Sequence, residues 1–65
     1  MQELVRVAVD AMGGDNAPAE IVKGAVTAVN ARNDIKVFLV GRSEYVQREL
    51  SKNTYPNELV EDVHP

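Results

Sequence analysis

The chain alternates apolar segments of strand length with segments of helical periodicity. In residues 4–10, one face of an extended chain carries only valines, and the other carries Leu4 and Ala8 beside Arg6. Because both faces are largely apolar, this pattern predicts a parallel strand that is covered on both sides. Residues 35–41 contain four consecutive apolar residues at positions 37–40, and they predict a second buried strand.

Two helices are predicted to follow these strands. Residues 18–32 place apolar side chains on a wide stripe with the period of an α-helix, formed by Ile21, Val22, Ala25, Val26, Ala28 and Val29. Pro18 suits the first turn of this helix, and Asp15, Asn16 or Ala17 is its predicted cap. Ser43 is predicted to cap a second helix that extends to about residue 51.

The resulting order of elements is β-α-β-α-(β), with a short third strand predicted over residues 58–64 after a loop at 52–57. Strands that alternate with helices indicate an α/β fold with a mainly parallel sheet and right-handed crossovers. Two helices can hardly cover both faces of such a sheet. Residues 1–65 are therefore predicted to be a single partial domain, the N-terminal segment of a larger α/β protein or a unit that completes its core with other chains.

Composition narrows the classes of function. The chain has 65 residues, a formal net charge of −3 and no cysteine. The acidic balance argues against a nucleic-acid-binding surface, and the absence of cysteine excludes a thiol nucleophile and thiolate metal sites. No apolar run approaches the roughly 20 residues of a membrane span, and the first residues do not resemble a signal peptide. A soluble cytoplasmic protein is the default expectation.

The candidate chemistry lies in the loop that follows the first strand, with the sequence DAMGGDN at residues 10–16. In open α/β sheets, ligands bind beyond the carboxyl ends of the strands. Gly13 and Gly14 let backbone N–H groups approach a ligand, and the start of the next helix favours an anion. The loop matches neither a dinucleotide-binding fingerprint nor a Walker loop. The alternative is a tight turn in which Asp10 accepts loop N–H groups and Asp15 caps the helix.

Other polar residues give weaker indications. Asp10 and Asp15 suit Mg²⁺ or Ca²⁺ in charge, but the spacing of a calcium loop is absent, so no metal is expected. Arg42 follows the second strand on the same side of the sheet and could face an anion, although a solvated arginine is the commoner outcome. His64 is the only histidine and is expected to be solvated.

The segment RVAVDAMGGDNAP, followed by an amphipathic helix and then IKVFLVG, resembles the start of the PlsX family of bacterial phosphate acyltransferases. The core of the resemblance is the run of residues 10–18. It extends well over residues 4–50, whereas the tail from Tyr55 onward matches less closely. A valine-histidine pair often ends the third strand in this family, and Val63 and His64 fall at that point.

The resemblance implies an acyltransferase that moves a fatty acyl group from acyl carrier protein to inorganic phosphate, forming acyl phosphate for phospholipid synthesis without a cofactor. It also implies a three-layer α/β/α sandwich, a homodimer and peripheral association with the cytoplasmic membrane. Gly13, Gly14 and Asn16 would form the phosphate-binding loop. Asp10 and Asp15 are assigned to the catalytic site, where they would orient the loop or hold basic residues, because like charges at close range repel phosphate.

Members of that family are several times longer than 65 residues, so most of the acyl-binding surface would lie beyond Pro65 and the isolated chain is expected to be inactive. Two other interpretations remain open. The chain could be a non-catalytic α/β fragment that self-associates to cover its sheet and binds anions weakly at most. It could also belong to a different α/β enzyme in which the loop binds a nucleotide phosphate.

Overall fold

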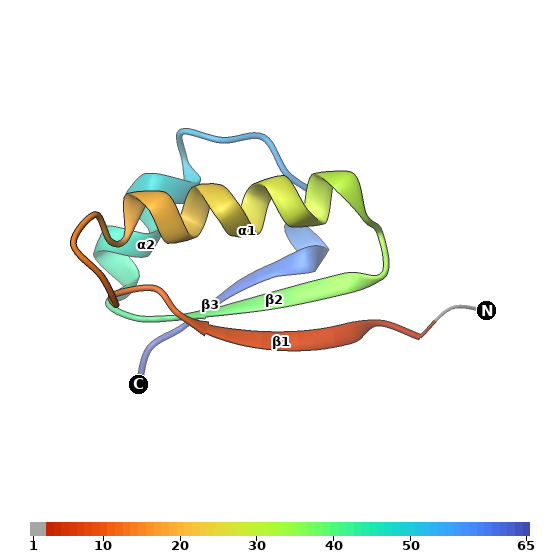
Figure 1. Cartoon of the computed structure of the whole chain (residues 1–65), viewed down its shortest axis with the longest axis horizontal. Coiled ribbons are helices and arrows are strands. Elements are labelled where there is room, and N and C mark those ends of the chain that lie inside the picture. The colour runs from red at the N-terminus through yellow and green to blue at the C-terminus, as the bar shows by residue number, and fades with distance from the viewer. Residues whose placement is uncertain (1–2) are drawn as a thin grey trace.

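The computed structural model describes residues 3–65 and contains the five predicted elements in the predicted order (Figure 1). They are β1 (Val5–Asp10), α1 (Ala19–Ala31), β2 (Ile35–Val40), α2 (Ser43–Leu50) and β3 (Val60–Val63). A 3₁₀ turn, Asn57–Leu59, precedes β3, so the third strand is shorter than the sequence predicts. The α/β class and the alternation of strands and helices are confirmed.

The three strands form one parallel sheet in the order β1-β2-β3, with β2 at its centre. The register of the first pair runs from Val5 opposite Ile35 to Asp10 opposite Val40. The ladder continues just past β1, because the Ala11 N–H donates to the Val40 carbonyl at 2.9 Å. The sheet therefore places the residues that follow β1 and β2 side by side at its carboxyl edge.

Both helices cover the same face of the sheet, so the described residues form two layers (Figure 1). Leu39 of β2, Val22 of α1 and Val46 of α2 are the largest fully buried side chains, and each comes from a different element of the core. Leu59 of the 3₁₀ turn closes this core at one end. No helix formed by residues 3–65 has the length and apolar character needed to cross a membrane.

The opposite face of the sheet has no helix over it among the described residues. Lys36 forms an ion pair with Glu61 there at 3.5 Å, and its ammonium lies 5.2 Å from the centre of the Phe38 ring. Within residues 3–65 the helices therefore cover one face of the sheet only, and cover of the second face of β1 stays a prediction. β1 is an edge strand, and even on the helix-facing side Val5 is 56% and Val7 39% exposed.

The predicted helix caps are also wrong. Pro18 occupies the cap position of α1, and no side chain of Asp15, Asn16 or Ala17 makes a capping hydrogen bond. Asp15 lies three residues before the cap, too early to reach the first free N–H groups, and the main-chain carbonyl of Asn16 accepts the Glu20 N–H instead, at 3.2 Å. Ser43, the predicted cap of the second helix, is instead the first residue of α2. The cap position is occupied by Arg42, whose backbone is extended and whose side chain makes no capping hydrogen bond.

Candidate functional site

The loop at residues 11–17 begins with a turn that Asp10 holds in place. The Asp10 Oδ1 atom accepts the N–H of Met12 at 2.9 Å, which turns the chain sharply as it leaves β1. Ala11, between them, is fully buried and stays in the sheet ladder. The carboxylate that was assigned to the catalytic site therefore has a positioning role within its own loop.

The two glycines of the loop have different surroundings. A Cβ atom at Gly13 would lie 3.4 Å from Oδ2 of Asp10, which is an ordinary van der Waals contact, so the space there does not require glycine. Gly14 has a φ of +97°, and nothing lies within 4 Å of the position a Cβ would occupy. Its backbone conformation, rather than a lack of space, is what requires glycine.

Asp15 and Asn16 lie on the exposed part of the loop, between the glycines and α1. The Ala17 N–H points back to the Gly14 carbonyl at 3.5 Å, which closes this part of the loop into a turn. Among residues 3–65, the side chains of Asp15 and Asn16 form no hydrogen bond or ion pair. Both polar groups are therefore accessible beside the start of a helix.

A mainly apolar pocket of about 540 Å³ lies at the carboxyl edge of β1 and β2. It is lined by Ala8, Val9, Asp10, Met12, Val40, Gly41, Arg42 and Pro65. Met12 closes one side, and it packs so near the second loop that a Cβ atom at Gly41 would lie 3.0 Å from its Cγ atom. Two loops that are far apart in sequence thus meet at one site.

The pocket brings Asp10 and Arg42 together, but it excludes the other four predicted residues. Gly13, Gly14, Asp15 and Asn16 lie along the loop outside its lining. Met12 and Gly41 were not predicted. The sequence indicates Gly41 only as a glycine directly after a buried strand. No sequence pattern indicates Met12, because its role depends on contact with the other loop.

Arg42 is exposed, and its Nε atom lies 3.7 Å from a carboxylate oxygen of Glu44. Its guanidinium carbon lies 5.6 Å from the centre of the Tyr45 ring. The expected solvated arginine is thus observed, with two neighbours from the first turn of α2. Because exposed ion pairs are weak, the guanidinium can exchange Glu44 for another anion at little cost.

The described residues contain no group of three or more His, Cys, Asp or Glu side chains that is close enough to hold a metal ion. His64 lies beyond the end of β3, exposed, with its Nδ1 atom 3.1 Å from the Pro65 carbonyl oxygen. The polar groups at the carboxyl edge of residues 3–65 include the loop amides, the carboxylates of Asp10 and Asp15, the Asn16 side chain and the Arg42 guanidinium with its neighbour Glu44.

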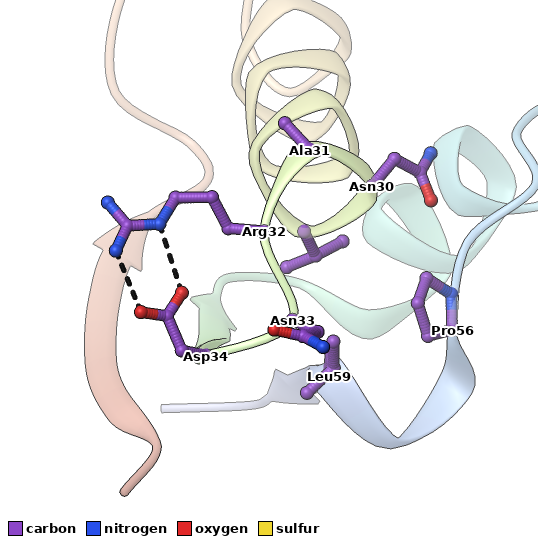
Figure 2. A pocket seen from close by; sticks show the side chains of 8 residues that line it. Asn30, Ala31, Arg32, Asn33, Asp34, Pro56 and Leu59 are labelled. Carbon is purple, nitrogen blue, oxygen red and sulfur yellow. Dashed lines mark hydrogen bonds and ion pairs between the residues drawn. The ribbon is translucent and has the colours of Figure 1, made fainter. Parts of the chain in front are cut away.

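A second pocket, of about 590 Å³, lies at the opposite end of the sheet, where α1 turns into β2 (Figure 2). Figure 2 shows the guanidinium of Arg32 facing the carboxylate of Asp34, with contacts of 3.0 Å from Nε and 2.7 Å from Nη2. On the far side of α1, Asn30 donates to the Thr54 carbonyl at 2.9 Å. These groups satisfy one another, so they hold the turn in shape and leave no unpaired charge for a ligand.

The contact with Arg32 has a consequence for acid stability. The hydrogen bond from the guanidinium lowers the pKa of the Asp34 carboxyl below its ordinary value of 3.8. A carboxyl whose pKa is lower in the folded state stabilises that state above its unfolded pKa. The stabilisation is lost as the pH falls through the lowered pKa.

We therefore expect Asp34→Asn to be less stable than the unchanged chain at pH 6, and the difference to shrink progressively below about pH 4. The effect is small, because Arg32 is 62% exposed and water screens the pair. Urea unfolding midpoints between pH 6 and about pH 2 measure it. Glu58→Gln removes a negative charge at an exposed position and serves as the control. A difference that grows toward low pH would contradict the assignment.

Most of this chain is similar in sequence to part of several curated bacterial proteins. A phosphate acyltransferase of Syntrophomonas wolfei is 49% identical over 57 residues, which is 86% of this chain and 18% of that protein. The phosphate acyltransferase of Desulfitobacterium hafniense strain Y51 is 46% identical over 71 residues, covering 95% of this chain and 21% of the relative. That of Clostridium beijerinckii is 45% identical over 56 residues, 86% of this chain and 17% of the relative.

The chain thus spans about a fifth of the length of the curated relatives it matches. The model of one protein family, described as fatty acid synthesis protein, matches residues 5–65. This match begins at the first residue of β1 and includes the loop, both helices and β3. Since it covers nearly the whole sequence, the chain belongs to the fatty acid synthesis protein family.

Proposed function

We propose that this chain forms the phosphate end of the active site in a phosphate acyltransferase that transfers a fatty acyl group from acyl carrier protein to inorganic phosphate. The observation that supports this most directly is the loop after β1, with Gly14 at a φ of +97° and the exposed Asn16 beside the start of α1. The relatives carry the name phosphate acyltransferase, which fits the same chemistry.

In the proposed reaction, a phosphate oxygen attacks the carbonyl carbon of the acyl thioester. A carbon–oxygen bond forms, the carbon–sulfur bond breaks, and the carrier thiolate leaves and takes up a proton. The active site must hold the phosphate dianion near the carbon and stabilise the negative oxygen of the intermediate. Neither step requires a cofactor or a metal in this proposal.

The loop residues take separate parts in this proposal. Gly13 and Gly14 leave the main chain uncovered, so that backbone N–H groups approach the phosphate, and the amide of Asn16 adds a donor. Asp10 orients the loop through Met12, and Asp15 holds a basic residue supplied by the remainder of a whole acyltransferase. These assignments keep both carboxylates away from direct contact with phosphate.

The remaining features of the proposal follow the family resemblance. The whole protein would be a three-layer α/β/α enzyme that acts as a homodimer in the cytoplasm, in peripheral contact with the membrane that contains its lipid products. Acyl carrier protein and phosphate would be its partners. The 65-residue chain alone would not catalyse the reaction.

A segment exchange tests the proposal. The segment of the Clostridium beijerinckii phosphate acyltransferase that matches this chain is replaced by residues 5–65, and acyl-phosphate formation is measured with acyl carrier protein thioester and phosphate. At 45% identity, we expect the exchange protein to retain acyl-phosphate formation within about tenfold.

The control is the same exchange protein assayed with nucleotides in place of inorganic phosphate. Product formation that requires a nucleotide would favour a nucleotide-binding loop. A soluble, folded exchange protein that forms no acyl phosphate would contradict the proposed function.

A further inference from the structure

Gly41 follows β2 directly, and it is buried. Its backbone does not require glycine, because Gly14 alone among the glycines of residues 3–65 has a positive φ. What position 41 lacks is space for a side chain. A Cβ atom there would lie 3.0 Å from Cγ and 3.2 Å from Sδ of Met12, closer than such atoms normally pack. The Met12 side chain therefore occupies the space that any larger residue at position 41 would need.

The main chain on both sides of this contact is held by hydrogen bonds. The Gly41 N–H donates to the Val63 carbonyl at 3.0 Å, which ties it to the end of β3. The Met12 N–H donates to Oδ1 of Asp10 at 2.9 Å. A methyl group at position 41 would therefore displace the Met12 side chain rather than either backbone. Because Cγ moves only by rotation about the Cα–Cβ bond, the whole side chain would turn away from β2.

The loop beyond Met12 has few other links to the sheet. Among residues 3–65, no hydrogen bond joins residues 13–16 to β2 or to the segment that follows β2. At its far end the loop is held by the Asn16 carbonyl, which accepts the N–H of Glu20 in α1. The packing of Met12 on Gly41 is thus the contact that fixes the distance between the loop glycines and the end of β2.

We propose that Gly41 is a positioning residue for the phosphate-binding loop, because its missing side chain lets Met12 hold that loop against the end of β2. The role rests on the proposed function, since it concerns the same loop. Gly41 contacts neither phosphate nor thioester in it. It acts through Met12, which fixes where the N–H groups of Gly13 and Gly14 lie, and a misplacement of about 1 Å can lower a rate by about a hundredfold.

A double-mutant cycle in the exchange protein tests this role. Gly41→Ala is expected to lower kcat/KM for phosphate by about tenfold, because a displaced Met12 leaves the loop N–H groups less well placed. Met12→Ala removes the same contact and is expected to cause a similar loss. In the Met12→Ala background, Gly41→Ala should change kcat/KM for phosphate by less than about twofold, since the added methyl group no longer meets the Met12 side chain.

The two Michaelis constants separate a displaced loop from a smaller amount of folded enzyme. In Gly41→Ala the KM for phosphate should rise, whereas the KM for the acyl carrier protein thioester should change by less than about twofold. A loss of folded protein alone would lower the apparent kcat and leave both constants unchanged.

The position of Met12 can also be measured without catalysis, in the 65-residue chain. Met12 is 38% exposed, so a side chain that Gly41→Ala turns into water should be oxidised by hydrogen peroxide about twofold faster. Mass spectrometry of proteolytic peptides measures the sulfoxide, with Met1 as the internal reference, and far-UV circular dichroism checks that the chains are equally folded. Gly24→Ala is the matched control, because it adds the same methyl group where nothing lies within 4 Å.

The two experiments distinguish this role from the proposed function. If the exchange protein forms no acyl phosphate, the proposed function fails, and the oxidation rates still decide whether Gly41 holds Met12 in place. Equal oxidation of Met12 in the folded Gly41→Ala and unchanged chains would overturn the role. An unchanged kcat/KM for phosphate in Gly41→Ala would also overturn it. The same holds for equal losses from Gly41→Ala with and without Met12, which would place the effect outside this contact.

Discussion

Leu39→Ala is expected to unfold a large fraction of the chain at 25 °C. Leu39 is fully buried near the carboxyl end of the middle strand, and it belongs to a core to which both helices contribute. Truncation of a buried leucine costs about 2–5 kcal/mol because it removes buried apolar surface and leaves a cavity. The free energy of unfolding of a 65-residue domain is itself only about 3–10 kcal/mol.

Urea unfolding followed by far-UV circular dichroism measures this loss. Leu4→Ala is the matched control, because Leu4 is 36% exposed just before β1 and its truncation should cost less than about 1 kcal/mol. An equal loss in the two variants would mean that the core is not centred on β2.

Gly14→Val in the exchange protein is expected to lower acyl-phosphate formation by about a hundredfold, the size of effect seen when a positioned N–H donor is lost. Gly14 adopts a φ of +97°, which a β-branched residue avoids, so the loop must take another path and its N–H groups move. The loss should appear in kcat as well as in the KM for phosphate, because displaced N–H groups hold both the bound phosphate and the transition state less well.

The conservative comparison is Gly14→Asn, because asparagine tolerates positive φ better than valine and should retain more activity. Asp10→Ala removes the acceptor of the Met12 N–H and should also reduce turnover. Rates that stay unchanged in Gly14→Val and Asp10→Ala would remove the loop from the active site. Circular dichroism of each variant separates a displaced loop from an unfolded protein.

Apolar periodicity predicts most of the fold, because burial against a sheet determines where these strands and α1 form. The start of β3 and the two helix caps were predicted wrongly, because they depend on the backbone conformation of a few residues. The predicted third strand loses its first residues to a 3₁₀ turn at Asn57–Leu59, in which Leu59 faces the core while Asn57 and Glu58 stay exposed. The predicted caps fail because Pro18 and Arg42 occupy those positions without a side-chain acceptor.

The candidate site is predictable only in part. The role of Asp10 as an acceptor of loop N–H groups follows from a short-range spacing of two residues, and the structure confirms it. The contact of Met12 with Gly41, by contrast, depends on the sheet register between β1 and β2. The partners of Arg42 likewise arise from the start of α2, so no pattern within one loop indicates them.

The strand order also gives the chain a direction of assembly. β2 is both the second strand made and the central strand of the sheet, so each strand after the first meets an edge that already exists. A polypeptide that has left the ribosome only as far as β2 already contains the whole β1–β2 ladder and the helix that crosses it. Synthesis from the N-terminus therefore builds this unit one crossover at a time, without waiting for a distant segment.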